Sequence, residues 1–139
     1  MKMLLAFAAA AAIAGQATDG RGDAAAMPRP ALVLFWADWC APCRAEMLAL
    51  PEIERAVAPL PVVVVPLSNW RALPAAVDRR KIRVPDGGGW DYLAALRIPP
   101  ALPAAAIVDA RGVRCAMHSG GLDALRAAAL VTACASIRK

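Results

Sequence analysis

"FWADWCAPCRAEM", residues 35–47, continues the apolar run of residues 31–34 and contains two of the four cysteines of the chain. Cys40 and Cys43 are separated by an Ala-Pro dipeptide. A CxxC pair of this kind serves as a disulfide that opens and closes, as half of a metal site, or as an inert cross-link. The structure expected for the flanking residues helps to choose among these three.

The flanking pattern favours a redox pair. Residues 31–36 are expected to form a strand, and after Cys40 apolar residues recur at helical spacing as far as Val57. Pro42 suits the first turn of such a helix, where its missing N–H costs nothing. The free N–H groups and the positive end of the helix dipole then favour a thiolate at Cys40. Cys43 lies one turn further on the same face, so Cys40 is the expected exposed nucleophile and Cys43 the shielded partner that resolves a mixed disulfide.

The rest of the chain predicts an α/β domain with a small mixed sheet. An unbroken run of valines is typical of a strand covered on both faces, and turn residues between the last two apolar runs predict a hairpin. Pro51 is expected to kink the first helix, and Pro74 weakens the second. The expected strands span 31–36, 59–66, 103–109 and 113–118, and the helices after the first span 70–82, 90–98 and 121–137.

The first residues have the composition and length of a signal peptide. It is expected to span residues 1–17, with cleavage after Ala14 or Ala17, and the alternatives are a buried helix and an uncleaved membrane anchor. Residues 18–30 are polar and rich in Gly and Pro, so they are predicted to be flexible, and residues 31–139 form the expected domain. Export implies an oxidising compartment, where a cysteine pair can cycle or stay closed.

The length of the chain limits it to one domain, and the distribution of its charges argues against a nucleic-acid-binding protein. The 139 residues suffice for one compact domain. The formal net charge is +5, but apart from the run at residues 79–81 the basic residues are scattered. A nucleic-acid-binding domain gathers its basic residues into a stripe with interleaved aromatic residues, so no nucleic-acid partner is expected.

The stretch "LVLFWADWCAPCRAEM" resembles the active-site segment of the thioredoxin superfamily. Its WCxPCRxEM pattern is especially similar to exported thiol–disulfide oxidoreductases of the TlpA/ResA type. A second stretch, "LPAAAIVDARG" at residues 102–112, is similar to the family segment in which a cis-proline opens a strand. The resemblance covers roughly residues 31–137. It implies the thioredoxin fold, in which helices flank both faces of a small central mixed β-sheet.

The resemblance also implies roles for individual residues. Cys40 attacks and Cys43 resolves, and the two form a redox disulfide. Pro103 is the expected cis-proline beside that disulfide, and the backbone of Leu102 pairs with an extended substrate. The remaining substrate contacts are assigned to the residues beside the nucleophile: Trp39, Ala41 and Pro42.

The implied function is that of a periplasmic thiol–disulfide oxidoreductase acting on client proteins with cysteines or disulfides. The resemblance favours a reductant, in cytochrome c maturation or disulfide repair, that receives electrons from a membrane reductase. No cofactor is needed, because the cysteine pair is itself the redox centre. Attachment to the membrane is expected only if the signal peptide is not cleaved.

Three positions depart from the family pattern: Leu34, Leu48 in place of a helix proline, and Ala104 in place of the usual Thr. Leu34 stands where thioredoxins carry a buried Asp, and no other acid is identified as its replacement. The charged residues of the first helix are expected to face solvent. The departure at Leu34 keeps open the hypothesis of a non-catalytic binding domain with the same fold.

The remaining cysteines and the single histidine carry a second alternative. Together with the CxxC pair, Cys115, His118 and Cys134 would complete a ligand set in a metal- or haem-handling protein, but their sequence separation disfavours this and no metal site is expected. Cys115 and Cys134 are interpreted as small buried apolar residues, with a structural disulfide as the alternative. His118 is expected at the surface or in a light hydrogen bond rather than in catalysis, and Trp70 and Trp90 are assigned to packing.

Overall fold

The computed structural model describes residues 27–137 of the chain. The predicted signal peptide at residues 1–17 and residues 18–26 of the segment predicted to be flexible lie outside the described residues. Among those described, no helix combines the length and the hydropathy that a membrane crossing requires.

The centre of the molecule is a four-stranded mixed sheet with the strand order β2-β1-β3-β4. β1 pairs in parallel with β2 and antiparallel with β3, and β3 pairs antiparallel with β4. The carboxyl ends of β1 and β2 and the amino end of β3 therefore lie at one end of the sheet. The strands are β1 (Ala31–Trp36), β2 (Val62–Pro66), β3 (Ala104–Val108) and β4 (Arg114–Ser119).

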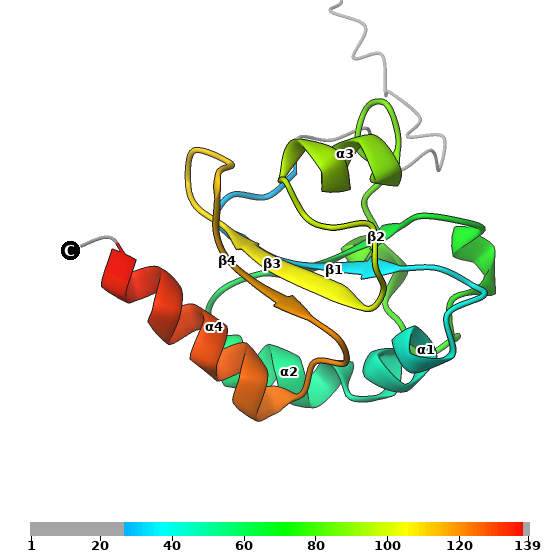
Figure 1. Cartoon of the computed structure of the whole chain (residues 1–139). Coiled ribbons are helices and arrows are strands. Elements are labelled where there is room, and N and C mark those ends of the chain that lie inside the picture. Colours follow the sequence, from blue (N-terminus) through cyan, green and yellow to red (C-terminus); the bar gives the residue numbers. More distant parts are fainter. Residues whose placement is uncertain (1–26, 138–139) are drawn as a thin grey trace, which may run out of the picture.

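Helices cover both faces of the sheet, as Figure 1 shows. Three helices lie against one face and α3 lies against the other (Figure 1). Two short 3-10 turns, η1 and η2, follow β2. The bounds are α1 (Ala41–Leu48), α2 (Leu50–Val57), η1 (Trp70–Ala72), η2 (Arg79–Lys81), α3 (Gly89–Ala95) and α4 (Ala124–Ile137).

The alternation of side chains along β1 divides the core into two layers. Leu34 and Trp36 pack with residues of α1, α2 and α4. Val33 and Phe35 point to the opposite face and pack with residues of α3. Every residue of β1 is fully buried, which explains why this strand reads as one continuous apolar run.

The first helix is broken where a kink was predicted. α1 ends at Leu48 and α2 begins at Leu50, with Ala49 between them in a helical conformation. Pro51 falls in the first turn of α2, where a missing N–H is tolerated. Because the break lies before the proline, each half keeps its own hydrogen-bonded ladder, and α2 can turn toward α4 independently of α1.

The prediction of a helix at residues 70–82 is wrong. This segment forms η1 and η2 with a non-helical stretch between them. Pro74 lacks a backbone donor and forces the preceding Leu73 out of the helical region, with φ −57° and ψ 142°. The other helices and strands agree with the prediction to within three residues at each end.

Cys115 and Cys134 are joined by a disulfide, so their interpretation as unpaired apolar residues is wrong and the alternative holds. Their Cα atoms are 5.2 Å apart, and the bond ties β4 to α4. A cross-link that closes a loop of this size stabilises the fold by about 3 kcal/mol in the chain-entropy description. α4 is thus held to the sheet by a covalent bond in addition to its apolar contacts.

Candidate redox site

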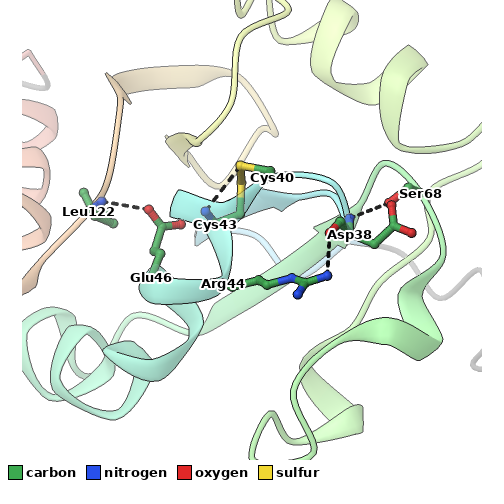
Figure 2. The surroundings of a disulfide bond; sticks show 7 residues. All are labelled: Asp38, Cys40, Cys43, Arg44, Glu46, Ser68 and Leu122. Atoms are coloured by element: carbon green, nitrogen blue, oxygen red, sulfur yellow. Dashed lines mark hydrogen bonds between the residues drawn. A yellow bond between two sulfur atoms is a disulfide. The ribbon is translucent and has the colours of Figure 1, made fainter.

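The turn after β1 places Cys40 at the amino end of α1. Cys40 is the N-cap residue, with extended backbone at φ −97° and ψ 98°. Its Sγ accepts a hydrogen bond from the backbone N–H of Cys43 at 3.3 Å, drawn in Figure 2. Pro42 lies in the first helical turn, as predicted. The sulfur therefore occupies the position at which free N–H groups and the helix dipole stabilise negative charge.

Cys40 and Cys43 form a disulfide within this turn. Their Cα atoms are 5.3 Å apart. Cys40 is 5% exposed and Cys43 is fully buried. The prediction of an exposed Cys40 is therefore wrong, and Cys40 is only the more accessible member of a buried pair. This order of accessibility fits an attacking Cys40 and a resolving Cys43.

Hydrogen bonds hold the loop that leads into the site. The N–H of Asp38 donates to Ser68 Oγ at 2.8 Å, and Arg44 donates to the Asp38 carbonyl at 2.8 Å (Figure 2). The N–H of Cys40 donates to the carbonyl of Ala37 at 3.2 Å. The loop carries Trp39, which is 66% exposed. A large apolar ring kept in solvent next to a disulfide is available to contact a client protein.

The sheet brings the predicted cis-proline to the same end of the molecule. The Leu102–Pro103 peptide bond is cis. Ala104, the next residue, pairs with Phe35 near the carboxyl end of β1, from which the chain continues to Cys40. Of the residues expected to contact substrate, Leu102 is half-buried. The others are exposed: Trp39, Ala41 and Pro42. Their roles stay predictions.

A buried carboxylate belongs to this site, and sequence reasoning missed it. Glu46 in α1 is only 3% exposed, so the prediction that the charged residues of this helix face solvent is wrong for this residue. Its Oε2 accepts a hydrogen bond from the N–H of Leu122 at 2.7 Å (Figure 2). Its Oε1 is buried and has no hydrogen-bond partner among the described residues. Burial raises the pKa of Glu46 to about 7, and the bond from Leu122 opposes this only in part.

Glu46 can act as a proton acceptor at this site. It follows Cys43 by three residues in the same helix, so the two side chains are neighbours on one face. A carboxyl group that titrates near neutrality suits proton transfer at physiological pH. Leu34 is apolar and lies in the same core cluster as Cys43. The buried acid therefore comes from the helix and not from β1. The spacing of Glu46 between Cys43 and the apolar Leu50 was the signal that could have revealed it.

The other candidate ligands do not gather around the disulfide. Within residues 27–137, no three side chains of the His, Cys, Asp and Glu types are close enough to hold a metal ion. Cys115 and Cys134 are bonded to each other on β4 and α4. His118 is partly buried, with Nε2 3.2 Å from the carbonyl oxygen of Gly121.

No family model matches the sequence, and no curated protein matches it. Solved structures do match. The thioredoxin-related protein from Neisseria meningitidis serogroup B has a TM-score of 0.60 at 21% identity, over 80% of this chain and 89% of that one. The chain has a thioredoxin fold. The prediction of this fold, with a small mixed sheet between helices on both faces, is confirmed.

Two further thioredoxin-fold matches agree with the first. The N-terminal domain of PilB from Neisseria gonorrhoeae has a TM-score of 0.56 at 19% identity, over 77% of this chain and 78% of that chain. The MTB protein dsbF, solved in mixed oxidized and reduced forms, has a TM-score of 0.52 at 23% identity, over 76% and 81% of the two chains. At these identities the similarity establishes the thioredoxin fold, and the chemistry of this chain has to be argued from its own residues.

Proposed function

We propose that this protein is an exported thiol–disulfide oxidoreductase that exchanges the Cys40–Cys43 disulfide with cysteines of client proteins. The observation that carries the proposal is the position of Cys40 Sγ at the N-cap of α1, where it accepts the Cys43 N–H and is more accessible than its partner. Among proteins of similar structure, dsbF was solved in mixed oxidized and reduced forms. A further similar structure, from Chlorobium tepidum, is described as that of a putative thiol:disulfide interchange protein.

The proposed reaction runs in the reducing direction. The Cys40 thiolate attacks one sulfur of a client disulfide, forms a mixed disulfide and releases the other client sulfur as a thiolate. Cys43 passes its proton to Glu46 and attacks Cys40 Sγ as a thiolate, which frees the second client sulfur and leaves the Cys40–Cys43 disulfide. A dithiol donor then reduces that disulfide by the same two exchanges. The pair itself carries both electrons, so the proposal includes no cofactor.

The surroundings of the pair fit a protein substrate. Trp39 is exposed beside Cys40, and Pro103 immediately precedes β3 at the same end of the sheet. In the proposal, the Leu102 backbone pairs with an extended client segment across Trp39, Ala41 and Pro42. The protein acts in the periplasm, as a reductant in cytochrome c maturation or disulfide repair, and a membrane reductase supplies its electrons. The signal-like residues 1–17 and the second disulfide support an oxidising compartment.

A trapping experiment tests this function. The Cys43→Ala variant keeps the attacking thiol but cannot resolve the mixed disulfide, so we expect it to accumulate covalent adducts with a defined set of exported proteins. Non-reducing gels and mass spectrometry of the purified variant identify these adducts. The Cys40→Ser/Cys43→Ala variant is the matched control and is expected to yield none. An adduct-free Cys43→Ala variant, or the same adducts in the control, contradicts the proposed function.

A further inference from the structure

An exposed tryptophan in the segment after β2 is flanked by two arginines. Trp70 is 37% exposed, and the guanidinium carbon of Arg71 lies 4.9 Å from the centroid of its ring. The guanidinium carbon of Arg79 lies 5.5 Å from the same centroid. The assignment of Trp70 to packing is therefore wrong, because its ring supports two cations at the surface. Such contacts hold guanidinium groups in place without neutralising them.

The segment that carries this tryptophan is fixed to the core. Leu73 and Val77 are 4% and 3% exposed and belong to the core cluster that contains both cysteines of the redox pair. The side chain of Asn69 accepts the N–H of Arg71 at 3.1 Å, and Arg79 donates to the carbonyl of Trp70 at 3.3 Å. Trp70, Arg71 and Arg79 thus form a surface that is held in place, which we call the Trp70 platform. A ligand that binds the two guanidinium groups does not have to order a loop.

The charge of the two arginines is not compensated within the described part of the chain. Asp78, which precedes Arg79, pairs with Arg80, and Glu54 pairs with Lys81. Neither Arg71 nor Arg79 makes a salt bridge among residues 27–137. Two like charges held on one ring repel each other. A carboxylate that binds either guanidinium group lowers this repulsion and gains charge-assisted hydrogen bonds.

A hydrogen bond connects the segment that carries Trp70 to the loop that leads into the redox site. Ser68, two residues before Trp70, accepts the N–H of Asp38, which lies two residues before Cys40 (Figure 2). With consecutive Cα atoms 3.8 Å apart, this connection limits the distance between the Cα atoms of Trp70 and Cys40 to roughly 22 Å. An extended peptide covers that distance with about six or seven residues. A client segment of this length that is bound at Cys40 is therefore long enough to extend as far as Trp70.

We propose that Trp70, Arg71 and Arg79 form a docking site for acidic segments of client proteins, with carboxylates within about seven residues of the reacting cysteine. This inference rests on the proposed function and names the class of client. The two guanidinium groups bind the client carboxylates while Cys40 attacks the client sulfur. The site adds affinity for the client and leaves the exchange chemistry at the cysteines unchanged.

Two model peptides test the docking site. Each carries one cysteine as a mixed disulfide with thionitrobenzoate, and five residues away one peptide has two glutamates and the other has two glutamines. Reduced protein releases the coloured thionitrobenzoate thiolate, forms the Cys40–peptide disulfide and then resolves it through Cys43. The reduced protein is in excess over the peptide, so that each protein molecule reacts once and no added reductant is needed. We expect the second-order rate constant of thionitrobenzoate release to be about tenfold higher for the acidic peptide at low salt, and the difference to fall below about twofold at 0.3 M NaCl.

Variants assign this preference to the two arginines. Arg71→Gln/Arg79→Gln is expected to lose the preference and to keep the wild-type rate with the glutamine peptide. Arg55→Gln/Arg111→Gln removes the same charge at the end of α2 and in the β3–β4 turn, at the opposite end of the sheet, and is expected to retain the preference. Equal rates on both peptides in the wild type, or a preference that survives Arg71→Gln/Arg79→Gln, overturns the docking site.

The same experiment separates this inference from the proposed function. Release of thionitrobenzoate from neither peptide refutes both the oxidoreductase and its docking site. Release at equal rates leaves the oxidoreductase standing and refutes the docking site. The membrane is the competing partner, so co-sedimentation with vesicles containing an anionic phospholipid is measured for the same variants. Vesicle binding that depends on Arg71 and Arg79, without a peptide preference, assigns the surface to lipid and overturns the proposal.

Discussion

Cys40→Ser is expected to abolish the reduction of insulin disulfides by this protein in the presence of dithiothreitol, a loss of at least roughly a hundredfold. The reason is that no second sulfur can take over the attack. Cys43 is fully buried beneath Cys40, and Cys115 and Cys134 are consumed by the second disulfide between β4 and α4. A serine hydroxyl at the same N-cap position is not ionised at neutral pH, so it forms no mixed disulfide.

The measurement is the rate of insulin precipitation, with dithiothreitol alone as the baseline. Cys43→Ser serves as the matched variant, because it replaces the other sulfur with the same hydroxyl. It is expected to form the first mixed disulfide with a client but to turn over slowly, since only external thiol can resolve it. Cys40→Ser activity above about a tenth of the wild-type rate would mean that another group is the nucleophile.

The second large effect concerns the pH dependence of stability at Glu46. Burial raises the pKa of this carboxyl to about 7, whereas the same group in the unfolded chain titrates near its ordinary value of 4.5. Between these values the folded protein binds the proton more strongly than the unfolded chain does. The contribution of protonated Glu46 to the free energy of unfolding is therefore complete below pH 4.5 and is lost as the pH rises through 7. A shift of this size corresponds to about 1–3 kcal/mol between pH 5 and pH 8.

Glu46→Gln removes this titration and retains an oxygen that can accept the Leu122 N–H. We expect the free energy of unfolding of the oxidised wild type to fall between pH 5 and pH 8 by about 1–3 kcal/mol more than that of the variant. Urea unfolding at several pH values measures the difference. Glu52→Gln, at an exposed carboxylate of α2, is the control and is expected to follow the wild type. Parallel curves for Glu46→Gln and the wild type would contradict a buried carboxyl that titrates near neutrality.

The sequence predicted those features that depend on short-range pattern. The strand at residues 31–36, Cys40 at the start of a helix and Cys43 one turn later all follow from neighbouring residues, and the structure has each of them. The break near Pro51 is of the same kind, since a proline acts on the turn in which it stands. The fold class followed from the order of these elements and from the resemblance.

The features that sequence reasoning missed or left open depend on which distant segments meet. Glu46 lies on a short helix whose exposed face carries the charged Arg44, and only the approach of Leu122, 76 residues later, shows that this carboxylate is buried. The Cys115–Cys134 bond requires α4 to pack against β4, which spacing along the chain does not specify. The arrangement around Trp70 was missed because of a local error. A helix was expected at residues 70–82, where Pro74 leaves only 3-10 turns.

The central claim is that Cys40 in the reduced protein ionises near neutral pH, because it caps α1. The most direct test is the rate of iodoacetamide alkylation as a function of pH in Cys43→Ala, in which Cys115 and Cys134 stay bonded to each other. We expect a midpoint below about 7.5, in the range of thiols at helix amino ends. A midpoint at about 8.5, that of an ordinary free cysteine, would contradict it.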